Sequence, residues 1–351
     1  MRVVVTGATG NVGSSVVERL TDQGAKVVGL ARRGDERQLG GAELVRADIT
    51  DDDLSHVFRG ADAVVHLAWL FQPVRHPDVT WRNNVGGTQR VLRAVEAADV
   101  PTLVVASSVG AYSPRSDLDE IDESWPTDGV PVTAYSREKA YVERLLDVHE
   151  ERHPSRRVVR LRPAFTFQHR SAVQQRRLFM GPFVPQRLLR PGRVPVLPAP
   201  RDLRLQLVHT DDIADAYAAS VTSPQARGAY NVTSEPTLGP TELAGLMHAR
   251  WVPTPARLLR AGLTAAHGAH VVPAAPELFD LLMSAPVMSA DKARTELGWK
   301  PRFSAEETLH AFLEGLREPT DASTPPLDPS TSGPARAQEL ATGVGETDSL
   351  R

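Results

Sequence analysis

The sequence predicts a doubly wound α/β fold, in which helices cover both faces of one parallel sheet. Short apolar, β-branched runs alternate with helical patterns from residue 2 to about residue 161. The runs are almost continuously apolar, which is typical of parallel strands buried on both faces. The predicted strands cover residues 3–5, 27–30, 42–46, 63–67, 103–107 and 158–161.

The first strand leads directly into a glycine-rich turn, followed by a helical pattern that stops near Gly24. Strand, glycine-rich turn and helix, in that order, form the context required for a dinucleotide-binding loop. Gly7 permits the tight turn, Gly10 lets the backbone approach a pyrophosphate, and Gly13 allows close packing of the helix on the strand. The helix N-terminus favours an anion. We therefore predict a Rossmann-type nucleotide-binding fold, with cofactor contacts from Gly7, Thr9, Gly10, Asn11, Val12 and Gly13.

The end of the second predicted strand distinguishes between the two nicotinamide cofactors. An NAD-binding fold usually has Asp or Glu there, which accepts a hydrogen bond from the ribose 2′-hydroxyl. This chain has Ala31, followed by Arg32 and Arg33. Arginine cannot accept that bond, but it can bind a 2′-phosphate. We predict that NADP(H) is preferred and that NAD(H) is possible; the alternative is that both arginines are merely solvated.

Three polar residues are candidates for catalysis. Tyr135 and Lys139 are four residues apart, so on a helix they lie on the same face. An unperturbed tyrosine titrates near pH ~10, and a nearby ammonium would stabilise the phenolate. Ser108 follows the fifth strand, and its hydroxyl could polarise a carbonyl group. The set suits proton transfer accompanying hydride transfer, although a Tyr/Lys pair at this spacing is common on ordinary helices and has weight only beside the glycine-rich loop.

With these motifs the chain resembles the extended short-chain dehydrogenase/reductases, also called the NAD-dependent epimerase/dehydratase family. Further motifs follow in the family's order over residues 1–317, including Asp48-Ile49, His66-Leu67-Ala68, Asn84–Thr88, Ala106–Tyr112 and Leu161-Arg162-Pro163. The resemblance implies that Ser108, rather than Ser107, is the catalytic serine. It implies cofactor contacts from Ala31, Arg32, Arg33, Asp48, Ile49, Leu67, Ala68, Trp69, Asn84, Ser107, Tyr135, Lys139, Arg162, Pro163 and Ala164. The substrate contacts that we expect are Trp69, Val109 and Phe165.

Two positions depart from the sugar-nucleotide branch of that family. Where its members usually carry an asparagine that binds the substrate diphosphate, this chain has Phe165. Where members of that branch carry an arginine, this chain has Leu205, and its nearest arginine, Arg204, is one residue earlier in the sequence. An apolar pocket suits a carbonyl compound without a nucleotide. We therefore predict an NADP(H)-dependent oxidoreductase acting on a small carbonyl or secondary alcohol. A sugar-nucleotide epimerase or dehydratase using the same triad is the alternative, and a cofactor-sensing protein without turnover is a third hypothesis.

Composition limits the other possibilities. The 351 residues include 40 basic and 43 acidic residues, a balance that does not indicate a nucleic-acid partner. The absence of cysteine excludes disulfides and thiolate chemistry. No apolar run approaches the ~18–20 residues that span a bilayer, and the chain starts with its first strand, so we expect a cytoplasmic protein without membrane association. His149 and His153 are four residues apart, but no carboxylate pattern accompanies them, and we predict no metal.

The fold is expected to comprise two parts and a tail. Residues 1–164 and 206–232 form the predicted nucleotide-binding domain, in which residues 207–209 return to the main sheet. Residues 165–205 and 233–317 form a smaller, discontinuous C-terminal substrate lobe, and residues 318–351 form a disordered tail. The resemblance also implies a homodimer formed through the Tyr/Lys helix. Its apolar positions Ala140, Val142, Leu145 and Leu146 could serve this interface or face the chain's own sheet.

Overall fold

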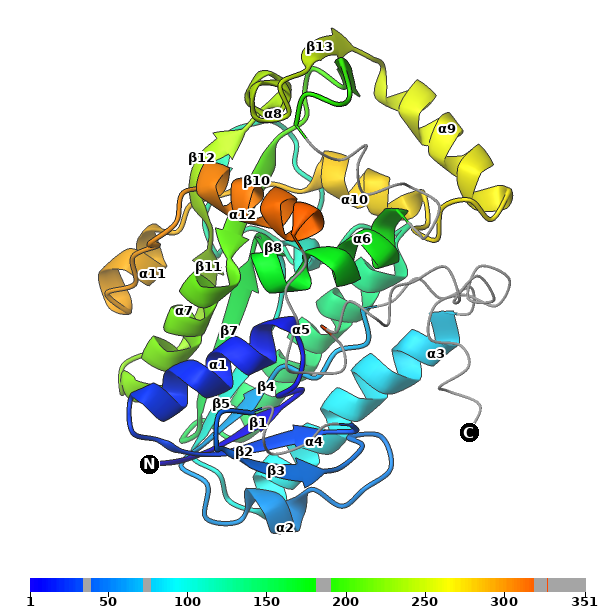
Figure 1. Ribbon diagram of the computed structural model, residues 1–351. Helices are drawn as coiled ribbons and strands as arrows, with labels where there is room; N and C mark the ends of the chain where they lie inside the picture. The colour runs from blue at the N-terminus through cyan, green and yellow to red at the C-terminus, as the bar shows by residue number, and fades with distance from the viewer. Residues whose placement is uncertain (34–38, 72–76, 181–190, 319–326, 328–351) are drawn as a thin grey trace.

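The computed structural model describes residues 1–33, 39–71, 77–180, 191–318 and 327. Its largest element is a parallel sheet of seven strands, in the order β11-β7-β5-β4-β1-β2-β3 (Figure 1). These strands are β1 (Arg2–Thr6), β2 (Lys26–Ala31), β3 (Glu43–Arg46), β4 (Ala63–His66), β5 (Thr102–Ala106), β7 (Arg157–Pro163) and β11 (Gly228–Val232). The predicted doubly wound α/β fold is confirmed, and all six strands predicted before residue 162 lie in this sheet.

Helices cover both faces of the sheet because successive residues of each strand point to opposite sides. In β1, Val3 and Val5 belong to the core beneath α1 (Asn11–Asp22) and α7 (Thr210–Thr222). Val4 belongs to the core on the other face, beneath α4 (Gly87–Ala97) and α5 (Ala134–Arg152). The shorter helices α2 (Ser55–Phe58), α3 (Pro77–Trp81) and η2 (Arg82–Gly86) accompany α4 and α5.

A second sheet corrects one prediction. Residues 207–209 do not return to the main sheet: they lie in β10 (Leu205–His209), which pairs with β8 (Phe165–Phe167) and β12 (Ser234–Leu238). The free edge of β7 is already taken by β11, so β10 pairs instead with the strand that follows β7 along the chain. The helices α6 (Ala172–Met180) and α12 (Ala305–Arg317) pack on this sheet with their own apolar core.

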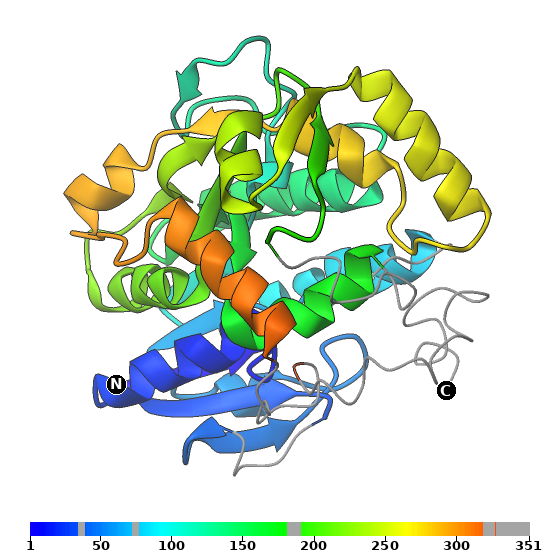
Figure 2. The same ribbon diagram turned by 45° about the horizontal axis from the view of Figure 1, so that its top comes forward.

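Most of the remaining elements lie beyond the carboxyl ends of the main strands (Figures 1 and 2). They are β6 (Glu120–Ile121), β9 (Val196–Ala199), β13 (Arg250–Pro253), β14 (Val287–Met288), α8 (Pro240–Leu246), α9 (Ala256–Gly268), α10 (Glu277–Ser284), η3 (Val109–Ala111) and η4 (His169–Ser171). The helix α11 (Asp291–Glu296) instead packs beside β11. Beyond residue 318 the structure describes Leu327, which is buried; the rest of the predicted disordered tail lies outside the described residues. Among the described helices, none has the length and apolarity needed to span a bilayer.

Candidate active site

The glycine-rich turn after β1 is packed so closely that two of its positions have no space for a side chain. Gly7 has φ +71°, and a Cβ there would lie 2.7 Å from the Ala68 nitrogen. A Cβ on Gly13 would lie 2.1 Å from the Gly7 oxygen, so α1 can approach the turn only with glycine at this position. Gly10 forms the N-cap of α1, and no side chain caps the helix there. The uncapped helix end and the close turn fit the pyrophosphate of a dinucleotide.

Neighbouring segments hold this turn in place. The Ala68 nitrogen donates to Thr6 Oγ1 over 3.3 Å, which places the segment after β4 beside the turn, as predicted for Leu67 and Ala68. Thr9 is buried, and Val12 packs on the core. Asn11 Oδ1 accepts a hydrogen bond from Gln168 Nε2 at 2.5 Å, a contact with the end of β8 that the sequence did not indicate.

The ends of β2 and β3 bring the predicted adenosine contacts together. Ala31 is buried, whereas Arg32 and Arg33 are exposed. The Arg32 Nη1 lies 3.9 Å from Asp48 Oδ2, and Asp48 Oδ1 also accepts from the backbone nitrogen of Thr50 at 2.9 Å. Ile49 packs against the start of α4: a Cβ on Gly87 would lie 2.6 Å from its Cδ1.

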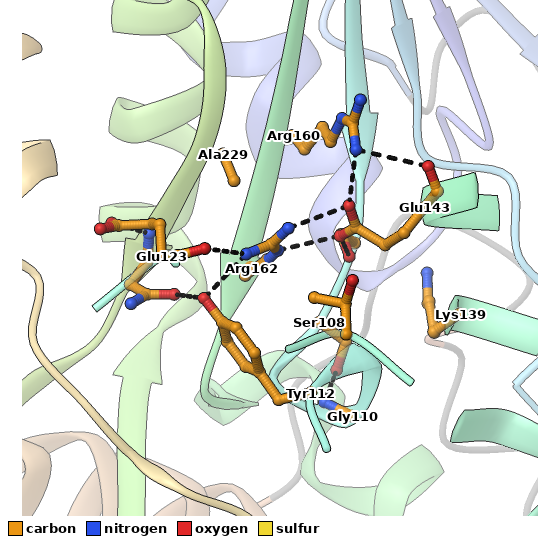
Figure 3. Close-up of polar contacts among 12 residues, drawn as sticks. Ser108, Gly110, Tyr112, Glu123, Lys139, Glu143, Arg160, Arg162 and Ala229 are labelled. Carbon is orange, nitrogen blue, oxygen red and sulfur yellow. Dashed lines mark hydrogen bonds and ion pairs between the residues drawn. The ribbon is translucent and has the colours of Figure 1, made fainter. Parts of the chain in front are cut away.

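Ser108 and Tyr135 meet at the carboxyl end of β5. Ser108 is buried, and its Oγ accepts from the Gly110 nitrogen at 3.0 Å (Figure 3). Tyr135 is in the first turn of α5, where Thr133 Oγ1 accepts from the Ser136 nitrogen at 3.0 Å and caps the helix. The Tyr135 ring and Ser108 lie against the same glycine: a Cβ on Gly110 would lie 2.7 Å from Tyr135 Cε1 and 3.4 Å from Ser108 Oγ. The structure therefore brings together the two residues whose hydroxyl groups are predicted to be catalytic.

Lys139 lies beside them in a nearly closed environment. Its Nζ donates to the Ala106 oxygen at 2.7 Å and lies 3.4 Å from the centroid of the Trp69 ring. Burial lowers the pKa of Lys139 to about 7, although Glu143 and Glu138 act to raise it.

The pKa of Tyr135 differs from our expectation. Burial raises it to about 12, and the hydrogen bond with Ser108 only partly opposes this. The Lys139 ammonium lies 5.9 Å from the centroid of the tyrosine ring, engaged by Ala106 and Trp69. Desolvation of the phenol therefore outweighs the lowering that we expected from Lys139.

A buried ion cluster lies under this site. The Glu143 carboxylate accepts from Ser107 Oγ at 2.5 Å, from Arg162 Nε at 2.9 Å and from Arg160 Nη1 at 3.0 Å (Figure 3). Arg162 also donates to the hydroxyl of Tyr112 at 3.0 Å. The side chains of Ser107 and Arg162, predicted as cofactor contacts, instead satisfy a buried carboxylate, which would be costly unpaired. A cofactor contact from either residue would have to use its backbone.

Asn84 connects the segment after β4 to α5. Its Oδ1 accepts from the Leu70 nitrogen at 2.6 Å, and its Nδ2 donates to Glu138 Oε2 at 2.7 Å. Asn84 was predicted as a cofactor contact, but its side chain in this structure positions the segment that carries Trp69. Pro163 and Ala164 end β7 at the same edge of the sheet, and the Ala164 nitrogen donates to the Val232 oxygen at 2.9 Å.

Aromatic side chains surround Tyr135. The Trp69 and Phe71 rings meet it edge-on, with centroid distances of 6.1 and 4.9 Å. Phe179 of α6 lies 5.7 Å from Phe71. The sequence offered no signal for Phe71 or Phe179, because both reach the site through tertiary contacts.

The other two predicted substrate residues, Val109 and Phe165, pack against hydrophobic cores. Val109 is buried in the core beneath α1 and α7. Phe165 is half-buried against the core of the smaller sheet. Neither was placed in the core by the sequence, since a single apolar residue after a strand has no periodicity to indicate its partners.

A carboxylate that the sequence did not indicate, that of Glu96, lies beside His149 and His153. Glu96 Oε1 lies 3.1 Å from His149 Nδ1 and 3.0 Å from His153 Nε2. Glu96 is at the end of α4, so its proximity depends on the packing of α4 against α5. The absence of a bound metal remains a prediction.

Fold and site define a nucleotide-binding α/β protein, and comparison with known proteins identifies its family. Residues 3–233 match the model of the NAD dependent epimerase/dehydratase family, and the chain belongs to that family. A UDP-glucose 4-epimerase of Streptomyces lividans is 36% identical over 155 residues, which are 41% of this chain and 46% of that protein. A putative dihydroflavonol 4-reductase of Synechocystis is 33% identical over 147 residues, 40% of this chain and 42% of that protein. The matches therefore span less than half of these relatives.

Solved structures support the fold over a greater length. The UDP-glucose 4-epimerase of Thermotoga maritima, solved with UDP-glucose, superimposes with a TM-score of 0.68 at 19% identity. That match covers 90% of this chain and 99% of the other. At this identity it establishes the common architecture.

Proposed function

We propose that the protein is an NADP(H)-dependent oxidoreductase that interconverts a small carbonyl compound and its secondary alcohol. The observation that carries this proposal is the packing of Ser108 and Tyr135 around Gly110, beside Lys139 and at the same edge of the sheet as a turn that fits a dinucleotide. Family membership supports nicotinamide-dependent chemistry.

NADPH bound at the glycine-rich turn would supply the hydride for the reductive direction. Ser108 donates a hydrogen bond to the carbonyl oxygen and holds it next to Tyr135, which transfers its phenolic proton to that oxygen. Since burial raises the pKa of Tyr135 to about 12, the phenol is protonated at neutral pH and ready to donate. Lys139, whose Nζ donates to the Ala106 oxygen, would also hold the nicotinamide ribose and stabilise the phenolate that remains after proton transfer.

The central test is Tyr135→Phe, which removes the proton donor and retains the ring. We expect turnover to fall by ~10²–10⁴-fold, because a positioned acid contributes that range. Affinity for NADPH, measured by its fluorescence, should stay nearly unchanged. Turnover equal to that of the unsubstituted protein would remove Tyr135 from the mechanism.

The preference for NADP(H) rests on Arg32 and Arg33, two exposed cations after β2 at the place of the usual acidic residue. Fluorescence titration with NADPH and NADH tests it. The double variant Arg32→Ala/Arg33→Ala should weaken NADPH binding about 10-fold or more, as expected for charge-assisted bonds to phosphate, and leave NADH binding unchanged. Arg93→Ala, an exposed site on α4, is the matched control. Tighter binding of NADH by the unsubstituted protein would contradict the preference.

A sugar-nucleotide epimerase or dehydratase is the second candidate, favoured by the likeness to UDP-glucose 4-epimerases. The same triad could oxidise a sugar transiently before inversion or elimination. Phe165 and Leu205 argue against it, because they stand where a diphosphate-binding amide and guanidinium would be expected. Calorimetric titration with UDP- and dTDP-sugars separates the two candidates: tight binding favours the epimerase or dehydratase.

A further inference from the structure

Two aromatic residues near Tyr135, Phe71 and Phe179, are not part of the cores formed by the described residues. Phe71 and Phe179 are half-buried, and neither belongs to the three clusters of buried apolar side chains. They come from different parts of the fold: Phe71 follows β4, and Phe179 is near the end of α6. Apolar rings left partly exposed beside reactive groups indicate a ligand-binding surface.

The arrangement of the rings limits what can lie against them. Trp69 and Phe71 both meet the Tyr135 ring at close to right angles, with interplanar angles of 82° and 78°. The Phe71 ring also meets Phe179 at 56° with centroids 5.7 Å apart. One face of Trp69 is occupied by the Lys139 ammonium, whereas Phe71 and Phe179 are partly exposed.

The Phe71 ring centroid lies 4.9 Å from that of Tyr135 and 5.7 Å from that of Phe179, so a substrate that receives the Tyr135 proton would have a carbonyl substituent near this pair of rings. Hydroxyl groups there would lose water without gaining a partner from phenylalanine, which is unfavourable. A flat aromatic group would gain edge-to-face or offset-stacked contacts in addition to apolar burial.

We propose that Phe71 and Phe179 bind an aromatic ring attached to the substrate carbonyl, so that the substrate class is aryl ketones or aldehydes and the corresponding aryl carbinols. This inference rests on the proposed carbonyl chemistry at Tyr135. It adds a specificity that neither the triad nor the glycine-rich turn provides.

A pair of ketones that differ in aromaticity tests the inference. Acetophenone and cyclohexyl methyl ketone have the same carbon skeleton, but only the first has a flat π system. We expect the full-length protein with NADPH to favour acetophenone about 10-fold in kcat/KM. Phe71→Leu and Phe179→Leu should each reduce that ratio toward one and change cyclohexyl methyl ketone less. Phe303→Leu, whose ring packs on His209 instead, should preserve the ratio.

Binding is measured separately from turnover, by ligand-observed NMR titration of both ketones into the complex with NADP⁺. Tighter binding of acetophenone that is lost in Phe71→Leu supports the aromatic site, whether or not turnover occurs. Equal binding of the two ketones, or a preference insensitive to both phenylalanine substitutions, overturns it. Selective binding without turnover would contradict the proposed function alone, whereas turnover of both ketones without selectivity would contradict this inference alone.

Discussion

Two buried charged residues of α5, Lys139 and Glu143, lie one turn apart and differ in how strongly their surroundings stabilise the charged form. Lys139 is buried, and its ammonium contacts the Ala106 oxygen and the face of the Trp69 ring. Burial lowers the pKa of Lys139 to about 7. Glu143 is buried between two guanidinium groups, and its pKa falls to about 2 because hydrogen bonds and charge from Arg162 and Arg160 together outweigh desolvation, individually the largest effect. The first residue is thus close to titration at neutral pH, while the second is a permanent anion that anchors the helix to β7.

Removing the charge of Glu143 is expected to destabilise the protein. Glu143→Gln leaves Arg160 and Arg162 partly unpaired in the interior, and breaking a buried pair typically costs about 3–5 kcal/mol. Urea unfolding measures the loss. The control Asp147→Asn removes a half-exposed carboxylate that also contacts Arg160, and should cost less than about 1 kcal/mol. Equal losses in the two variants would contradict a special role for the buried anion.

At the scale of elements, α4 and α5 are joined at their ends by Glu96 with His149 and His153. His149 Nδ1 is hydrogen-bonded to Glu96 Oε1 at 3.1 Å, and His153 Nε2 lies 3.0 Å from the same oxygen. Arg156 acts on His149 as a nearby positive charge, which disfavours a further cation. A hydrogen-bonded link between two helices accounts for this cluster.

Removal of metal should therefore have no effect on the untagged protein. Extended dialysis against a chelator is expected to leave the melting temperature and the cofactor affinity unchanged. Because the chain has no cysteine, zinc retained by the protein could be attributed to histidine and carboxylate ligands. One equivalent of zinc that is lost in His153→Ala would refute this prediction.

At the scale of the whole molecule, the outer face of α5 presents apolar groups to the surroundings. Tyr141 and Val148 are 41% and 45% exposed, and the Tyr141 ring lies 4.9 Å from that of Trp81, which is 42% exposed. By contrast, Val142 and Leu146 face the chain's own core, which resolves the alternative left open by the sequence for these positions. The exposed face suits the homodimer implied by the family.

Light scattering tests that association. We expect a dimer whose dissociation is promoted by Tyr141→Asp, since a charge would be desolvated at the interface. Leu258→Asp, at a 60% exposed position of α9, should not affect it. A monomer at all concentrations of the unsubstituted protein would exclude the homodimer.

Stability should also fall with acidification below about pH 6.5. Burial, assisted by the charge of Lys139, lowers the pKa of His66 to about 3 in the folded protein, from the usual histidine value of 6.5. The neutral ring lies between Thr6 Oγ1 at 2.7 Å and Thr88 Oγ1 at 3.0 Å. Between pH 3 and pH 6.5, His66 is protonated in the unfolded chain but neutral in the folded protein. The contribution of His66 to folding stability is therefore complete above pH 6.5 and is lost as the pH falls toward 3.

The measurement is the free energy of unfolding as a function of pH. Well below pH 6.5, His66→Gln should reduce the slope by about 1.4 kcal/mol per pH unit relative to the unsubstituted chain. An exposed histidine, His310, provides the control His310→Gln, which should leave the slope nearly unchanged. Parallel curves for the unsubstituted chain and His66→Gln would contradict a buried neutral histidine.

Local patterns in the sequence determined the parallel sheet, the turn with Gly7 and Gly13, and the pairing of Ser108 with Tyr135. Each depends on residues close in the chain, or on the rule that parallel strands place their carboxyl ends at one edge. Tertiary structure alone decided that β10 leaves the main sheet and that Arg162 binds Glu143. It also decided that Phe71 and Phe179 meet beside Tyr135. These contacts join residues that are far apart in the chain and share no sequence periodicity. They form because an unpaired buried charge or an exposed apolar surface is unfavourable, and the packing of the elements determines which partners are within reach.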